Sequence, residues 1–88
     1  MLHKNLLDIL GRGGLQRDGD TFVVPSGLSV TVYLDVGQEA LIVDRVARIE
    51  VGTEVIFVVT ARKERYAVES DAISAVRFHP ESNGPGYA

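Results

Sequence analysis

The sequence predicts a mainly β domain: a small antiparallel barrel, or a strongly bent sheet, of roughly five to six strands with a short N-terminal helix. Two observations lead to this prediction. Residues 21–78 form a nearly unbroken series of short apolar or alternating segments separated by turn-forming residues. The chain has 88 residues and no cysteine, so one hydrophobic core, alone or with an oligomeric interface, must stabilise the fold.

Residues 2–10 are predicted to form the helix. Its apolar face, at helical spacing, consists of Leu2, Leu6, Ile9 and Leu10. Gly11 follows, at the position where a left-handed residue often ends a helix. Because an isolated helix of this length is only marginally stable in water, we expect its apolar face to be buried against the sheet or against another copy of the chain.

The first half of the sheet is predicted from three segments. Residues 21–24 form a strand, and Pro25-Ser26-Gly27 supplies a tight turn. Residues 28–34 alternate strictly between apolar and polar side chains, which predicts one core face and one solvated face. Residues 39–51 predict a long strand with a bulge near Asp44-Arg45, a bend that would let one strand serve two sheets.

The second half begins at residues 55–59, an apolar run typical of a central strand that is covered on both faces. A polar hairpin turn, a returning strand, a short helical turn and a closing strand are then predicted at residues 62–65, 66–69, 70–72 and 73–78. Residues 79–88 are rich in turn formers and predict a disordered tail. Residues 1–78 are therefore expected to form one domain.

The motifs that could carry chemistry are incomplete. Gly11-Arg12-Gly13-Gly14 lacks the strand before it and the Gly-Lys-Ser/Thr after it that a phosphate-binding loop requires. Asp18-Gly19-Asp20 lacks the further oxygen ligands of a calcium loop and indicates a turn. His3 and His79 have no neighbours arranged for nucleophilic catalysis or metal binding. We therefore predict a protein that is not an enzyme, with no catalytic residue, metal or cofactor.

Charge and hydropathy narrow the range of partners. The net charge is −3 and the isoelectric point is near 5.2, which disfavours nucleic acid unless the basic residues gather on one face. Residues 1–10 are too short and too charged to act as a signal peptide or to span a membrane. The sequence thus predicts a cytoplasmic protein with no membrane partner.

The order of the predicted elements resembles that of the Sm-like and SH3-like small barrels. The resemblance covers residues 28–78 and rests on Val32-Tyr33-Leu34-Asp35-Val36-Gly37, on the long strand, and on Tyr66-Ala67-Val68 leading through Asp71-Ala72-Ile73 to the closing strand. It implies a small barrel with an edge-paired, ring-forming habit.

The residues that bind RNA in Sm-like proteins are not carried over to this chain. That family has a second glycine in the long strand and an Asp/Asn pair that holds the base, whereas this chain has Val43-Asp44-Arg45-Val46. The closing strand has Ala75-Val76-Arg77-Phe78 in place of the Arg-Gly step of the family. The resemblance therefore implies an assembly habit and no RNA pocket.

Unpaired strand edges make association with other proteins the favoured function. Residues 21–24 and 73–78 are the expected edges, and an edge strand is a template for adding a strand from a partner. The predicted interface comprises Leu2, Leu6, Ile9, Leu10, Phe22 and Phe78. We predict a non-enzymatic interaction module that forms a homo-oligomer and docks a second protein.

The alternative is a nucleic-acid-binding small barrel. It would use the basic hairpin, with Arg62, Lys63, Arg65 and Tyr66. The competing interpretation of these residues is that the arginines pair across strands with acidic side chains such as Glu50 and Glu69, which is common on β surfaces. A small-molecule site is disfavoured because a barrel of this size can scarcely hold a pocket.

Overall fold

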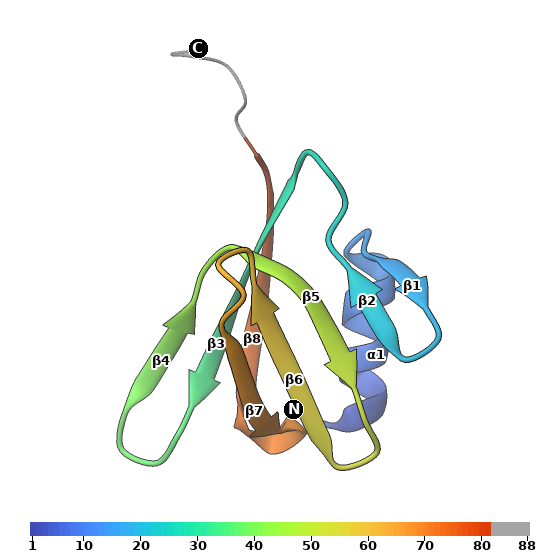
Figure 1. Cartoon of the computed structure of the whole chain (residues 1–88). Coiled ribbons are helices and arrows are strands. Elements are labelled where there is room, and N and C mark those ends of the chain that lie inside the picture. The colour runs from blue at the N-terminus through green and yellow to red at the C-terminus, as the bar shows by residue number, and fades with distance from the viewer. Residues whose placement is uncertain (82–88) are drawn as a thin grey trace.

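The computed structural model describes residues 1–81 and confirms a mainly β fold with an N-terminal helix (Figure 1). The elements are α1 (His3–Arg12), β1 (Gln16–Asp18), β2 (Thr21–Val23), β3 (Leu28–Asp35), β4 (Ala40–Val43), β5 (Val46–Val51), β6 (Val55–Thr60), β7 (Arg65–Glu69), the short 3₁₀ helix η1 (Ser70–Ala72) and β8 (Ile73–Pro80). In residues 1–81 no helix is long and apolar enough to cross a membrane.

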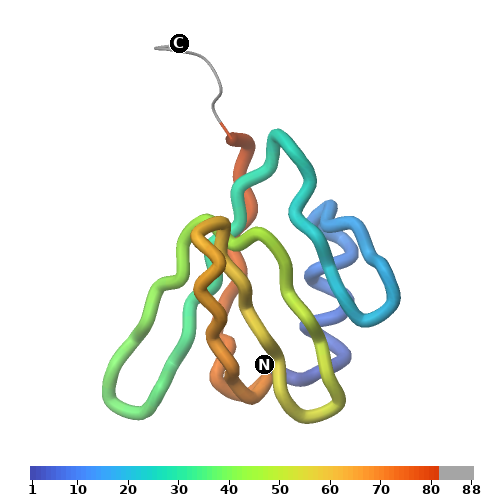
Figure 2. The backbone as a smooth tube through the Cα atoms, viewed as in Figure 1, coloured from blue at the N-terminus to red at the C-terminus, as the bar shows by residue number. Residues whose placement is uncertain are grey.

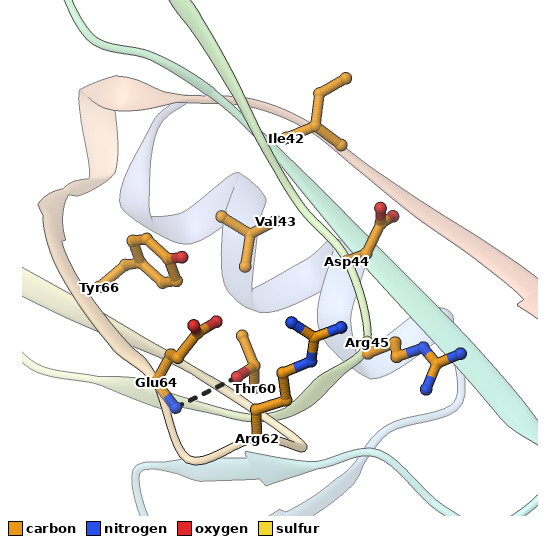
Figure 3. Close-up of a pocket in the computed structure, with 8 residues that line it drawn as sticks. All are labelled: Ile42, Val43, Asp44, Arg45, Thr60, Arg62, Glu64 and Tyr66. Atoms are coloured by element: carbon orange, nitrogen blue, oxygen red, sulfur yellow. Dashed lines mark hydrogen bonds between the residues drawn. The ribbon is translucent and has the colours of Figure 1, made fainter.

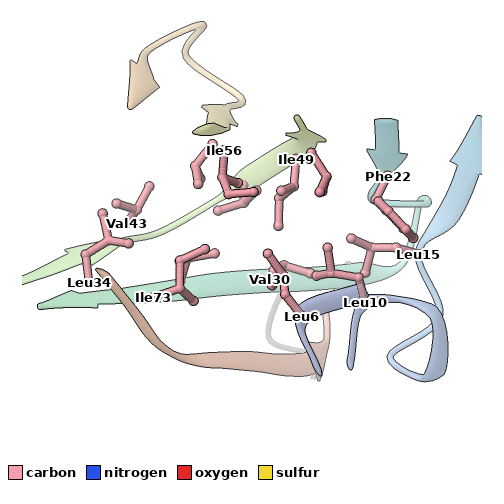
Figure 4. Close-up of a cluster of buried hydrophobic side chains, with 14 residues drawn as sticks. Leu6, Leu10, Leu15, Phe22, Val30, Leu34, Val43, Ile49, Ile56 and Ile73 are labelled. Atoms are coloured by element: carbon pink, nitrogen blue, oxygen red, sulfur yellow. The ribbon is translucent and has the colours of Figure 1, made fainter. Parts of the chain in front are cut away.

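The strands form two antiparallel sheets. Sheet A has the order β1-β2-β5-β6-β7, and sheet B has the order β4-β3-β8. Within the described residues the strands do not close into a barrel, so the alternative of a bent sheet is the one observed. The two sheets face each other, and the apolar side chains between them form the core (Figure 4).

Side chains from both sheets and from the helix fill this core. Leu34, Val43 and Ile73 lie at one end, and Leu6, Leu10, Leu15 and Phe22 lie at the other (Figure 4). The strict alternation of strand β3 explains its contribution, since Val30, Val32 and Leu34 are all buried on one face.

The chain crosses from sheet B to sheet A at Asp44 and Arg45. The sequence predicted one long strand with a bulge here, and the structure has two separate strands, β4 and β5. Arg45 adopts a left-handed backbone with φ 55°, which ends strand β4 and redirects the chain. The irregular register itself lies slightly later, between Val46 and Arg48. The predicted change of sheet is thus present, through a sharper corner than a bulge.

Helix α1 covers the part of sheet A that the narrower sheet B does not reach (Figure 1). Leu6 and Leu10 are fully buried against the sheets, the first of the two alternatives left open by the sequence. The main-chain nitrogen of Met1 donates hydrogen bonds to the carbonyl oxygens of Ser70 and Ile73, both at 3.1 Å. The start of the helix therefore lies beside the connection between β7 and β8 (Figure 2).

The end of helix α1 differs from the prediction. Gly11 lies inside the helix, which continues to Arg12, and it is Gly14 that adopts a left-handed φ of 96°. Arg12 Nε donates a hydrogen bond of 2.9 Å to Asp8 Oδ1, one turn earlier. That hydrogen bond raises the pKa of Arg12 above its ordinary value. Gly13 lies directly under the ring of Phe78, which leaves no room for a side chain.

Three further strand predictions need correction. Strand β1, at residues 16–18, was not predicted; it pairs with β2 through a turn that contains Gly19. Strand β6 is only partly covered on its second face: Ile56, Val58 and Thr60 are buried on the core face, whereas on the other face Val55 is exposed, Phe57 is partly buried and Val59 is buried. Strand β8 continues to Pro80, so two residues assigned to the tail belong to the sheet, and residues 82–88 lie outside the described residues.

Candidate protein-interaction surfaces

Three of the six predicted interface residues lie in the core. Leu6, Leu10 and Phe22 are between 0% and 1% exposed, and all three pack within a single chain. The structure thus corrects their assignment as partner contacts, because their burial needs no second copy. The helical spacing of the leucines identified a buried face but could not say what buries it.

The other three predicted interface residues differ in exposure. Ile9 and Phe78 are partly buried, and the ring of Phe78 packs over Gly13 at the end of helix α1. Leu2 is 62% exposed. The six predicted side chains therefore do not form one exposed surface.

The four free strand edges of the described fold carry different residues. Strand β1 presents only polar side chains, β7 begins with Arg65 and ends with Glu69, and β8 carries Arg77 and ends at Pro80. Charge and proline are the usual means by which an edge strand discourages pairing. The predicted edge at residues 21–24 is wrong because β1 covers it, whereas the predicted edge at β8 is confirmed.

Strand β4 is the exception among these edges. Its four residues, Ala40-Leu41-Ile42-Val43, include no charged or polar side chain. Leu41 is 38% exposed and Ile42 is 57% exposed. Figure 1 shows β4 at the outermost side of sheet B, where no other strand of residues 1–81 borders it. We call this unpaired side of β4, from Ala40 to Val43, the β4 edge.

The hairpin between β3 and β4 determines which backbone N–H and C=O groups of the β4 edge are unpaired. The amide of Val36 donates a hydrogen bond of 3.0 Å to the carbonyl of Glu39, which makes this the first hydrogen-bonded pair of the ladder. Because such pairs alternate in an antiparallel ladder, Leu41 bonds to β3, while the N–H and C=O groups of Ala40 and Ile42 point away from it. The β4 edge therefore offers unpaired backbone donors and acceptors.

A polar hollow of about 290 Å³ lies beside the β4 edge, at the corner where the chain leaves sheet B (Figure 3). We call it the Arg62 hollow. It is lined by Ile42, Val43, Asp44, Arg45, Thr60, Arg62, Glu64 and Tyr66. The amide of Glu64 donates a hydrogen bond of 3.2 Å to the hydroxyl of Thr60, which fixes the β6–β7 turn at the base of the hollow. Among residues 1–81, neither Arg45 nor Arg62 forms an ion pair.

The basic hairpin does not form one surface. Arg62 and Tyr66 line the Arg62 hollow, whereas Lys63 and Arg65 line a separate hollow with Arg48. Successive side chains of β7 point to opposite faces of sheet A, which separates Arg65 from Tyr66. Arg62 and Lys63 lie in the turn before β7, where Lys63 has a left-handed φ of 69°. The predicted four-residue patch for an anionic partner is thus divided between two places.

Acidic and aromatic side chains already engage Arg65. It lies 3.6 Å from Glu50, which also accepts a hydrogen bond of 2.9 Å from Arg48, and its guanidinium stacks 4.4 Å above the centre of the Phe57 ring. The cross-strand pairing that competed with the nucleic-acid interpretation is therefore present at this arginine.

Residues for metal chemistry do not cluster in the described part of the chain. No group of three or more His, Cys, Asp or Glu side chains in residues 1–81 is placed to hold an ion. His3 lies on α1 and His79 lies near the end of β8, on separate elements.

The β4 edge was missed by the sequence analysis, although a signal was present. Residues 40–43 are an uncharged aliphatic run directly after the turn at Gly37 and Gln38. That run was joined to residues 46–51 as one strand, so its own free edge was not considered.

No family model, curated protein or solved structure matches this chain. The class that the fold defines is therefore a small two-sheet β domain.

Proposed function

We propose that this protein is a non-enzymatic interaction module that self-associates and docks a protein partner through the β4 edge. One observation carries the proposal: of the four free edges in the described fold, the β4 edge alone combines unpaired backbone groups with exposed aliphatic side chains and no charge. Its Leu41 and Ile42 supply the apolar contact.

Strand addition explains how such an edge binds. A partner strand gains main-chain hydrogen bonds to Ala40 and Ile42, and its side chains pack beside Leu41 and Ile42 on the two faces of the sheet. Removing these aliphatic groups from water stabilises the complex by about 25 cal/mol for each Å² buried. Val36, which is 47% exposed, extends the apolar surface at the hairpin end.

The test compares two substitutions of exposed aliphatic side chains by lysine. Ile42→Lys places a charge on the β4 edge, while Val55→Lys places one on β6, a strand that is paired on both sides. We expect the wild type and Val55→Lys to self-associate in a dilution series measured by light scattering, and Ile42→Lys to be monomeric. Circular dichroism checks that both variants keep the fold.

Two results would contradict the proposal. One is a wild-type chain that remains monomeric up to millimolar concentration and binds no added strand. The other is an Ile42→Lys variant that associates as strongly as Val55→Lys, since a lysine on the pairing edge must weaken strand addition.

The second candidate function is nucleic-acid binding, and the observation that favours it is the presence of Arg45, Arg62 and Tyr66 around one hollow. It is supported less well than protein docking, because Arg65 is engaged by Glu50 and Lys63 faces another hollow. Counterion release predicts affinity for RNA or DNA that falls steeply with salt. Absence of binding at low salt in a fluorescence anisotropy titration would remove this candidate.

A further inference from the structure

We infer that the strand which the β4 edge accepts is the β4 strand of a second copy, paired antiparallel about a two-fold axis that passes beside Leu41. The inference rests on the proposed function and specifies its partner, register and symmetry. It would join the two copies of sheet B into one continuous sheet with the order β8-β3-β4-β4-β3-β8.

The direction of the backbone groups sets the register. Two antiparallel strands exchange hydrogen bonds through residues whose N–H and C=O groups point toward each other, which on the β4 edge are Ala40 and Ile42. By symmetry, Ala40 of each copy pairs with Ile42 of the other. These two pairs together form about four backbone hydrogen bonds. Leu41 then lies opposite Leu41 of the second copy across the axis, as a non-hydrogen-bonded pair.

Neighbouring registers lose part of this ladder. If Ile42 faced Ile42, then Ala40 would have to pair with Asp44, beyond the end of the strand at the corner formed by Arg45. If Ala40 faced Ala40, Ile42 would pair with Gln38 in the turn beside Gly37, which is left-handed with φ 87°. Only the register centred on Leu41 uses strand residues throughout.

The side chains also match in this register. Leu41 lies on the same face of β4 as the buried Val43, yet 38% of it is exposed. Leu41 of the second copy would bury that exposed surface. On the opposite face, the small Ala40 would lie beside the larger Ile42 of the second copy.

Charges at the two ends of β4 favour a copy in antiparallel orientation. Asp35 and Glu39 are exposed at the hairpin end, while Arg45 and Arg62 lie at the corner end together with Asp44 and Glu64. Antiparallel pairing in this register places Glu39 of each copy diagonally opposite Arg45 of the other. An in-register parallel arrangement would instead place Glu39 beside Glu39 and Arg45 beside Arg45.

The test uses single cysteines, since the chain has none of its own. Across the axis, Leu41→Cys would place two thiols on directly opposed residues, at a separation that a disulfide spans. We expect Leu41→Cys to form covalent dimers roughly tenfold faster than Val55→Cys under mild oxidation, because the control cysteine has no opposed copy. Ala40→Cys and Ile42→Cys should each cross-link slowly alone and rapidly when mixed with each other.

The outcomes separate this inference from the proposed function. Fast self-cross-linking of Ile42→Cys or of Ala40→Cys would overturn the register, although edge-mediated self-association would stand. Cross-linking of Leu41→Cys no faster than that of Val55→Cys, in a wild-type chain shown to be dimeric by light scattering, would overturn the two-fold arrangement. Thermal unfolding of each reduced variant shows that the fold is intact, which keeps slow cross-linking interpretable.

Discussion

Gly11 and Gly13 lie two positions apart, yet their surroundings impose opposite requirements. Gly11 is in the last turn of helix α1, and apart from its chain neighbours and the helix backbone no atom of residues 1–81 lies within 4 Å of the position that a β-carbon would occupy. Gly13 caps the helix, and a β-carbon there would overlap the ring of Phe78. Packing therefore does not require glycine at position 11, whereas it does require glycine at position 13.

Alanine at these two positions should change stability in opposite directions. Gly11→Ala is expected to raise the free energy of unfolding by about 0.5–1 kcal/mol, because alanine loses less backbone entropy in a helix. Gly13→Ala is expected to lower it by about 1–3 kcal/mol, because the Phe78 ring must move. Urea unfolding of the two variants measures both effects, and a stabilising Gly13→Ala would show that Phe78 does not pack on the helix end.

Residue patterns predicted side-chain burial better than side-chain partners. The spacing of Leu6 and Leu10 and the alternation of Val30 and Val32 correctly marked core-facing positions. The left-handed backbone of Arg45 could not be predicted, since arginine rarely adopts that conformation and nothing in its neighbours requires it. The corner at that residue divides the expected long strand into β4, at the edge of sheet B, and β5, inside sheet A.

At the level of elements, helix α1 belongs to the core of the single chain. Leu6 and Leu10 form its buried face, and the exposed Leu2 precedes its first turn. Each fully buried leucine stabilises the fold by about 1.5–3 kcal/mol through burial alone. A charged substitution at Leu6 would therefore unfold the domain rather than report on an interface.

Alanine substitutions can separate the two leucine environments of the helix. Leu6→Ala is expected to lower the free energy of unfolding by about 2–5 kcal/mol, since it leaves a cavity between the helix and the sheets. Leu2→Ala, at an exposed position, is expected to change it by less than about 0.5 kcal/mol. Denaturant titrations followed by circular dichroism provide the comparison, and equal effects would place α1 outside the core.

Strand β1 shows which elements the sequence leaves undetermined. Gln16-Arg17-Asp18 has no apolar alternation, so only its pairing with β2 identifies it as a strand. That pairing turns a predicted edge into an internal strand. The order of strands in a sheet depends on such tertiary pairing, and this is why the β4 edge was found only in the structure.

For the whole molecule, the unequal widths of the two sheets explain the architecture. Sheet A has five strands and sheet B has three, so the inner face of sheet A needs a further cover, which helix α1 provides. The sequence predicted the mainly β class and the helix because both have local periodic signals. It could not predict two open sheets in place of a barrel, since closure depends on whether the free edges of the two sheets meet in three dimensions.

The pairing of β3 with β8 also bears on biosynthesis. Val30 lies opposite Phe78 and Val32 lies opposite Val76, so a strand made early in translation receives its neighbour only after residues 73–80 have left the ribosome. The β3–β4 hairpin can form early, but sheet B cannot be completed until β8 has emerged. Until then β3 lacks one of its two neighbours, and an unpaired edge of this kind is prone to aggregation.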